Sequence, residues 1–327
     1  MILITGGAGF IGSVLQAALA RMGQATIVAD RLRDNGKWRN LASHPPDEIV
    51  PPEALEAWLN TAPNLDAVVH LGAVSATTAT NGDHTWASNV ALSQHLWRWC
   101  ASHAVPLIYA SSAATYGDGS AGFDDDATLA HLLRLRPLNL YGWTKHAFDL
   151  WVARQVANSA AVPPFWAGLK FFNVYGPNEY HKGSMISVVK VKHDEVAQGL
   201  PPRLFRADRP DLADGQQRRD FIWIDDVVDV MLWLLRGPHP GSSLYNLGTG
   251  RARSYLDLAY AVCHANEVAA AVEYIPMPQS LVGQYQNFTE ARIDRLRAAG
   301  YAREFTSLEE GVTRYVRDYL RGPTPYR

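Results

Sequence analysis

The sequence predicts a doubly wound α/β fold, in which a parallel sheet carries helices on both faces and a smaller α/β lobe completes the chain. Two observations lead to this prediction. Short apolar segments alternate with amphipathic segments along most of the 327 residues. The apolar segments are continuous, which is typical of strands in a parallel sheet that is covered on both faces.

The first thirty residues form the clearest unit. Residues 2–5 are a short apolar strand, and a glycine-rich turn follows it. Apolar residues from Ile11 to Met22 recur every three or four positions, which predicts a helix that ends at Gly23. Residues 25–30 then form a second strand, so this segment is predicted to be a βαβ unit.

The later elements continue the alternation. Further strands are predicted at residues 67–71, 106–111, 169–174, 220–224, 244–247 and 272–275. Helices are predicted at residues 89–101, 141–156, 227–235, 255–265, 290–299 and 308–320. Ser307 and Glu310 have the spacing of a capping box before the last helix. Residues 207–218 are polar and rich in turn-forming residues, which predicts a loop.

Composition excludes several classes of protein. Hydrophobic residues are 47% and charged residues 19% of the chain, which is ordinary for a globular protein. The net charge of −2 argues against a nucleic-acid or anionic-membrane partner that is bound mainly through charge. Cys100 and Cys263 form neither a disulfide framework nor a metal-type spacing, so we expect no metal site. With no signal peptide and no membrane span recognised, we expect a cytoplasmic protein.

The glycine turn indicates a dinucleotide site. Gly6, Gly9 and Gly12 give a GxxGxxG spacing between a strand and a helix, within a βαβ unit of the expected length. Gly6 permits the tight turn, Gly9 lets the backbone approach a pyrophosphate, and Gly12 permits close helix packing. The helix N-terminus offers free N–H groups to the phosphates, so we predict a Rossmann cofactor site here.

The end of the second strand leaves the choice of cofactor open. Asp30 stands where an acid takes the ribose hydroxyls of NAD. Arg31, Arg33 and Lys37 follow at once, and a cation there could hold the 2′-phosphate of NADP. The residues alone do not decide between the two cofactors.

Three residues suggest oxidation of an alcohol. Tyr141 and Lys145 are four residues apart, which places both on one face of a helix. The ammonium, together with the charge of an oxidised nicotinamide, would lower the pKa of the tyrosine and make it a general base. Ser112 follows a predicted strand, at the sheet edge where ligands bind, and could hydrogen-bond the reacting oxygen.

This set of residues resembles the extended short-chain dehydrogenase/reductase superfamily, in which serine, tyrosine and lysine act on a sugar hydroxyl. The segments FFNVYGP at 171–177 and YNLGTG at 245–250 resemble its nucleotide-sugar branch of epimerases and dehydratases. The segments HKGSM at 181–185, YASSAATYG at 109–117, RDF at 219–221 and GQYQ at 283–286 resemble the ADP-heptose 6-epimerase family.

The resemblance implies a redox-neutral reaction on a nucleotide sugar. Bound NADP would take hydride from C6 of the heptose and return it to the other face of a 6-keto intermediate. Tyr141 would exchange a proton on one face and Lys182 on the other. Ser112 would orient the oxygen, and Lys145 would assist Tyr141 and hold the cofactor ribose. The family also implies a homo-oligomer, a pentamer, and a place in lipopolysaccharide core synthesis.

Other roles follow from matching segments. Besides the glycines, the cofactor would contact Phe10, Ile11, Asp30, Arg31, Lys37, Leu71, Gly72, Ala73, Ser75, Asn89, Tyr141, Lys145 and Val174. The nucleotide sugar would contact Ser112, Asn173, Lys182, Ser184, Phe205, Arg219 and Tyr285. A guanidinium such as that of Arg219 suits a diphosphate. We expect a dinucleotide-binding domain at 1–173 and 220–250, and a substrate-binding lobe at 174–219 and 251–327.

Two departures and three alternatives accompany this hypothesis. The loop at 207–218 is longer than the family pattern, and Thr144 stands where serine is usual. A UDP-hexose 4-epimerase would share the glycine turn and the tyrosine–lysine pair. A dehydratase would need an acid beside Ser112, where Ala113 and Ala114 stand instead. A cofactor-binding sensor without catalysis would tend to lose Tyr141 or Lys145, and both are present.

Overall fold

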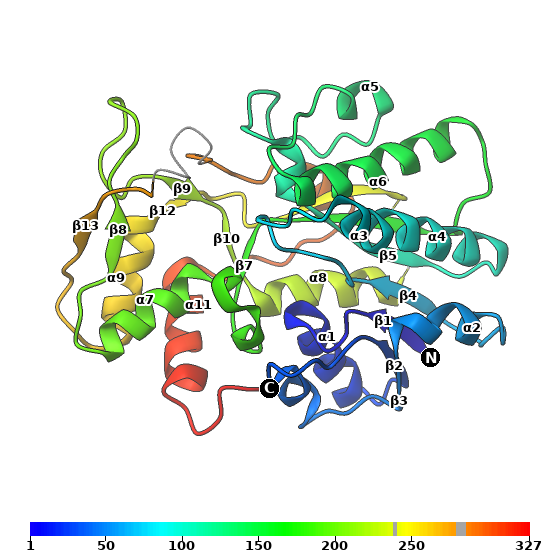
Figure 1. The fold of residues 1–327 in the computed structure, drawn as a ribbon, viewed down its shortest axis with the longest axis horizontal. Helices are drawn as coiled ribbons and strands as arrows, with labels where there is room; N and C mark the ends of the chain where they lie inside the picture. Colours follow the sequence, from blue (N-terminus) through cyan, green and yellow to red (C-terminus); the bar gives the residue numbers. More distant parts are fainter. Residues whose placement is uncertain (238–240, 279–285) are drawn as a thin grey trace.

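A computed structural model describes residues 1–237, 241–278 and 286–327. Its centre is a seven-stranded sheet in the order β11-β6-β5-β4-β1-β2-β3, in which every neighbouring pair is parallel (Figure 1). The strands are β1 (Ile2–Thr5), β2 (Thr26–Ala29), β3 (Glu48–Val50), β4 (Ala67–His70), β5 (Leu107–Ser112), β6 (Trp166–Phe171) and β11 (Ser243–Leu247). The order reverses between β1 and β4, so the doubly wound α/β prediction is confirmed.

Helices cover both faces of this sheet. On one side lie α1 (Phe10–Arg21) and α8 (Ile224–Arg236), and on the other α4 (Leu92–Ser102) and α6 (Leu140–Ala157) (Figure 1). Short helices join these layers: α2 (Leu55–Leu59), α3 (Gly82–Trp86), α5 (Leu129–Leu132) and α10 (Asp294–Ala298). Among the described helices, none has the length and apolarity that crossing a membrane requires.

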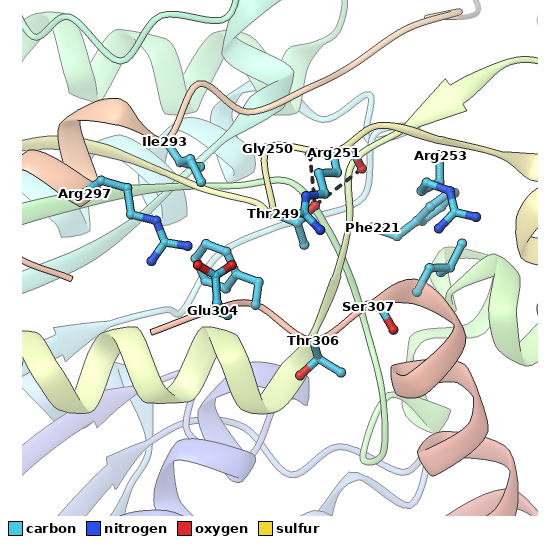
Figure 2. Close-up of a pocket in the computed structure, with 12 residues that line it drawn as sticks. Phe221, Thr249, Gly250, Arg251, Arg253, Ile293, Arg297, Glu304, Thr306 and Ser307 are labelled. Carbon is cyan, nitrogen blue, oxygen red and sulfur yellow. Dashed lines mark hydrogen bonds between the residues drawn. The ribbon is translucent and has the colours of Figure 1, made fainter. Parts of the chain in front are cut away.

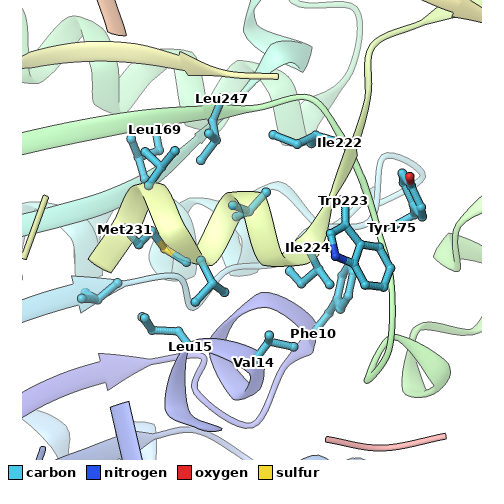
Figure 3. Packing of buried hydrophobic residues seen from close by; sticks show 14 of the residues in the cluster. Phe10, Val14, Leu15, Leu169, Tyr175, Ile222, Trp223, Ile224, Met231 and Leu247 are labelled. Atoms are coloured by element: carbon cyan, nitrogen blue, oxygen red, sulfur yellow. The ribbon is translucent and has the colours of Figure 1, made fainter. Parts of the chain in front are cut away.

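The two faces of the sheet bury different residues of the same strands. Ile2 and Ile4 pack with α1 and α8, whereas Leu3 packs with α4 and α6. This alternation follows from the two-residue period of a strand. Figure 3 shows the first of these cores, where Val14 and Leu15 of α1 face Met231 of α8. The covered sheet explains why the central strands are mostly apolar, with buried polar side chains such as His70 and Lys170 near their carboxyl ends.

One predicted strand is in fact two. The segment at 169–174 divides into β6, in the main sheet, and β7 (Asn173–Tyr175), which pairs with β10 (Phe221–Trp223). Phe172 lies between them, where its N–H bonds to Leu247 O and its carbonyl accepts from Val174 N. This turn directs the chain out of the main sheet and toward the smaller lobe.

The remaining elements lie at one end of the sheet (Figure 1). They are α7 (Val188–Ala197), β8 (Arg203–Phe205), β9 (Arg218–Arg219), β12 (Arg253–Ser254), α9 (Tyr255–Ala265), β13 (Glu273–Ile275) and α11 (Leu308–Arg314). β8 pairs with β13, and β9 pairs with β12, so segments distant in sequence interleave here. The loop predicted at residues 207–218 is confirmed except at Arg218, which begins β9.

Two local predictions for this end are corrected. At Ser307 only half of the capping box forms: its hydroxyl accepts from Glu310 N, but the Glu310 carboxylate pairs with Arg314 instead. A full capping box occurs at Ser254 and Asp257. The predicted helix at 290–299 shortens to α10, whereas the one at 308–320 is confirmed over its full length, as α11 continued by the π-helix η6 (Tyr315–Leu320).

Candidate active site

An open cavity of about 850 Å³ lies at the carboxyl ends of β1 and β4, where the strand order reverses. Open α/β sheets bind ligands at this kind of position. Most of the predicted cofactor residues line it together: Gly6, Gly9, Phe10, Ile11, Gly12, Asp30, Arg31, Lys37, Leu71, Gly72, Ala73, Ser75, Tyr141 and Lys145. These residues come from four separate parts of the sequence, which therefore meet at one site.

The glycine turn is built so that no side chain fits. Gly6 has a φ of +69°, and a Cβ there would lie 2.7 Å from Gly72 N. A Cβ on Gly12 would lie 2.4 Å from Gly6 O, so only a glycine lets the start of the helix pack this closely against the turn that follows β1. Helix α1 begins at Phe10 with no side-chain cap. Its first N–H groups are thus available to an anion, and the cradle fits a dinucleotide pyrophosphate.

Asp30, directly after β2, is the most heavily bonded charged residue at the cavity edge. Its carboxylate accepts from Ala8 N at 3.0 Å, from Arg31 N at 2.7 Å and from the Lys37 ammonium at 2.6 Å. Both charged side chains of the Asp30–Lys37 pair are 11% exposed. Lys37 therefore neutralises Asp30, while the Arg31 guanidinium pairs with Glu53 at 2.7 Å.

Ser112, Tyr141 and Lys145 meet where β5 ends against the start of α6. Asn139 caps α6 by accepting from Gly142 N at 2.8 Å, which fixes the turn that carries Tyr141. Tyr141 and Ser112 share a side-chain hydrogen bond. The Lys145 ammonium donates to Ala110 O at 2.8 Å, so it is held along β5.

The pKa values of Tyr141 and Lys145 are set mainly by burial. Burial raises the pKa of Tyr141, although the hydrogen bond with Ser112 opposes this shift. Burial also lowers the pKa of Lys145 to about 8, and the nearby Asp149 carboxylate opposes that change. The protein's own groups thus favour the phenol, because desolvation and the nearby Asp149 carboxylate outweigh the hydrogen bond with Ser112. The positive charge of an oxidised nicotinamide is the other group that was expected to lower the pKa of Tyr141.

Lys182 reaches the same cavity from a different segment, η5 (Tyr180–Met185). Its ammonium lies 5.0 Å from the centroid of the Phe10 ring. Burial lowers the pKa of Lys182, and the Glu179 carboxylate partly restores it. Two groups that can exchange protons, Tyr141 and Lys182, therefore line one cavity from separate elements.

Some predicted residues do not line this cavity. They are Ser112, Asn89, Asn173, Val174, Ser184, Phe205 and Arg219. Asn89 lies behind the wall, where it bonds to Val74 N and O and to the Thr144 hydroxyl. Arg219 contacts the Tyr255 ring, with its guanidinium carbon 5.7 Å from the centroid. Tyr285 lies outside the described residues.

Several lining residues were missed by the sequence analysis. Asn35, Glu53, His84, His181 and Met185 all face the cavity. The sequence could have indicated His181, because it belongs to the segment that carries Lys182, but no sequence pattern marks Glu53.

A second cavity of about 310 Å³ lies near the end of β11, with Arg251, Arg253 and Arg297 around it (Figure 2). None of the predicted site residues that the structure describes lines this second cavity.

The described residues contain no group of three or more His, Cys, Asp or Glu side chains that could hold a metal ion.

Fold and site together define an enzyme class: a Rossmann dinucleotide-binding enzyme with the serine, tyrosine and lysine of short-chain dehydrogenases. The chain belongs to the NAD dependent epimerase/dehydratase family, whose model matches residues 2–248.

Full-length relatives narrow the comparison. An ADP-L-glycero-D-manno-heptose-6-epimerase of Nitratidesulfovibrio vulgaris is 46% identical over 331 residues, with 100% of both chains covered. An enzyme of the same name from Fusobacterium nucleatum is 43% identical over 339 residues, again with full coverage of both.

Solved structures of nucleotide-sugar epimerases have the same fold as this chain. The ADP-L-glycero-D-manno-heptose-6-epimerase of Helicobacter pylori superposes with a TM-score of 0.78 at 27% identity, covering 97% of this chain and 94% of the other. A Thermus thermophilus UDP-glucose 4-epimerase, solved with NAD, gives a TM-score of 0.76 at 26% identity, with 99% of each chain covered.

Proposed function

We propose that this enzyme inverts C6 of ADP-D-glycero-β-D-manno-heptose to give the ADP-L-glycero-β-D-manno-heptose epimer, through a transient 6-keto sugar. The observation that carries this proposal is the presence of Tyr141 and Lys182 in one cavity, on separate elements, beside the glycine cradle. Inversion of a carbon by oxidation and reduction exposes two faces of the sugar, so two proton-transfer groups suit it. The full-length relatives bearing that name support the choice of substrate.

The cofactor in this proposal is NADP. Asp30 would repel a 2′-phosphate if it were bare, but Lys37 neutralises it at 2.6 Å. Arg33 lines the same end of the cavity and supplies further positive charge, whereas the charge of Arg31 is paired with Glu53. The Gly6–Gly12 turn would hold the pyrophosphate, as its geometry supports.

The chain's own residues would manage the protons and the orientation. When bound, the nicotinamide supplies reversible acceptance and return of a hydride. Ser112 would orient the sugar oxygen through its contact with Tyr141, and Tyr141 and Lys182 would each exchange one proton with that oxygen. Lys145, held by Ala110 O, would favour the tyrosinate and hold the cofactor ribose.

The finer parts of the proposal concern the substrate and the assembly. Asn173, Ser184, Phe205, Arg219 and Tyr285 would contact the nucleotide sugar. The substrate-binding lobe would comprise residues 174–219 and 251–327, and the dinucleotide-binding domain residues 1–173 and 220–250. The homo-oligomeric state, the cytoplasmic location and the role in lipopolysaccharide core synthesis stay predictions.

The direct test is epimerisation without added cofactor. The purified protein is incubated with ADP-D-glycero-β-D-manno-heptose, and the C6 epimers are followed by proton NMR. Appearance of the L-glycero epimer would support the proposal and indicate that cofactor is retained. No conversion, even with NADP⁺ and NAD⁺ added, would overturn it and turn attention to UDP-sugars such as UDP-glucose.

A further inference from the structure

The segment that carries Lys182 has little internal support. η5 is a short 3-10 turn interrupted at Gly183, whose φ of +55° and ψ of −128° are not helical. Within this segment, Lys182 N donates to Glu179 O at 3.1 Å and Ile186 N to Gly183 O at 3.2 Å. A long side chain on such a turn keeps a defined position only if other elements hold the backbone.

Asn35 donates to His181 O and Tyr180 to Pro325 O, and Asn40 adds buried bonds from a distant part of the chain. It is 2% exposed and lies in η1 (Lys37–Leu41), after the second strand. Its amide nitrogen lies 3.0 Å from Asn178 O, 3.2 Å from His181 Nδ1 and 3.0 Å from Ala8 O. One amide therefore joins the residues just before Lys182 to the glycine turn.

A second bond strengthens the same junction. The Asn178 amide donates to the Ser13 hydroxyl of α1 at 3.0 Å and approaches Asn40 O at 3.4 Å. Asn178 is fully buried and has a φ of +73°, so its own backbone depends on these partners. The base of η5 is thus bonded to both η1 and α1.

The far end of Lys182 contacts the same cradle. Its ammonium stands over the ring of Phe10, the first residue of α1. Backbone and side chain of Lys182 therefore rest on the glycine turn and its helix, whereas Tyr141 is held by Asn139 on α6. The two proton-transfer groups have independent supports.

We propose that Asn40 is a positioning residue for Lys182, which acts by bonding the 178–181 segment to the glycine turn. This inference rests on the proposed function for its kinetic consequence, but not for its structural one. The Asn40 amide shares two hydrogens among its three neighbours, and any donation to His181 Nδ1 needs the neutral ring. Burial lowers the pKa of His181 to about 4, which keeps its ring neutral at physiological pH.

The structural test compares Asn40→Ala and Asn40→Ser with the wild type. Hydrogen exchange should become about tenfold faster in peptides covering 179–186, with little change in α6. Competitive amine labelling, read by mass spectrometry, should show altered reactivity of Lys182. Asn40→Ser keeps one donor and should show a smaller effect, which protects the test if the alanine variant folds poorly. Asn60→Ala, at an exposed asparagine after α2, is the control and should behave as wild type.

The kinetic test is a double-mutant cycle with Lys182→Met. Asn40→Ala should lower kcat by about tenfold to a hundredfold in the wild-type background, because misplacement of about 1 Å can cost that much. In the Lys182→Met background, Asn40→Ala should lower kcat by less than about twofold, because the lysine that Asn40 positions is already absent. Equal losses in both backgrounds, or unchanged exchange at 179–186 in a folded variant, would overturn the inference. If the wild type fails to epimerise the heptose, the proposed function fails, and the exchange and labelling still decide the positioning role.

Discussion

Lys170 and Asp149 form a fully buried ion pair, 2.7 Å apart, directly behind the candidate catalytic residues. Lys170 on β6 also donates to the Thr115 hydroxyl at 2.7 Å. Asp149 on α6 accepts from the Ser111 hydroxyl at 2.7 Å. The pair therefore joins helix α6, which carries Tyr141, to the strand that ends at Ser112. This cross-link gives the site a rigid back wall.

The first prediction concerns the stability that this pair maintains. Asp149→Asn should lower the free energy of unfolding by about 3–5 kcal/mol, because it leaves the Lys170 charge buried without its partner. Urea unfolding measures the effect. The double variant Asp149→Leu, Lys170→Met should lose less unfolding free energy than Asp149→Leu and Lys170→Met lose when their separate losses are added. The reason is that the double variant removes both charges together. A loss below about 1 kcal/mol in Asp149→Asn would contradict the argument.

The second prediction concerns the phenol of Tyr141. Tyr141→Phe should lower epimerase activity by about 10²- to 10⁴-fold, because the ring stays in place and the proton donor is lost. The midpoint of thermal unfolding should change little. Trp143→Phe is a matched control two residues along the same helix, where the side chain is 48% exposed and its ring lies tilted against that of Trp86. Wild-type turnover in Tyr141→Phe would exclude this tyrosine from the chemistry.

The third prediction concerns cofactor choice. Lys37→Ala removes the cation that neutralises Asp30, so it should weaken NADP binding by about tenfold to a hundredfold and affect NAD much less. Calorimetric titration of cofactor-free protein with each dinucleotide gives the ratio. Lys190→Ala, which breaks a similar lysine–aspartate pair with Asp194 on α7, should leave the ratio unchanged. An equal loss for both cofactors would mean that Lys37 does not read the 2′-phosphate.

Local patterns predicted the fold well, and the glycine turn that they singled out lines the cavity. The turn at Gly6 and the spacing of Tyr141 and Lys145 depend on a few neighbouring residues, so the sequence displays them directly. Lys182 has no local signal and was found only through resemblance. Asn40 and Asn178 are 138 positions apart, and no periodicity links them. The lowered pKa predicted for Tyr141 includes the charge of a bound nicotinamide and stays a prediction; the opposing effect of burial was missed, because burial depends on packing that a sequence does not display.

The last prediction uses the buried imidazole of His70, at the end of β4. Its Nδ1 lies 2.6 Å from the Thr5 hydroxyl and its Nε2 lies 2.9 Å from the Ser93 hydroxyl. Burial lowers its pKa to about 3, and Lys145 adds to the shift. A histidine in an unfolded chain has a pKa near 6.5. Below that pH, His70 is therefore protonated in the unfolded chain and stays neutral in the folded chain. This contribution to stability is complete above about pH 6.5 and is lost as the pH falls toward about 3.

The slope of unfolding free energy against pH measures that proton. Between about pH 6 and pH 4.5, His70→Asn should reduce the slope by about 1.4 kcal/mol per pH unit, which is the contribution of one proton. Its stability near pH 7 should also fall, by about 1–3 kcal/mol, where buried hydroxyls lose a partner. His84→Asn, at an exposed histidine, serves as the comparison and should keep the wild-type slope. If His70→Asn keeps the wild-type slope as well, the imidazole of His70 must be protonating inside the folded protein, and its burial would not resist acid as argued.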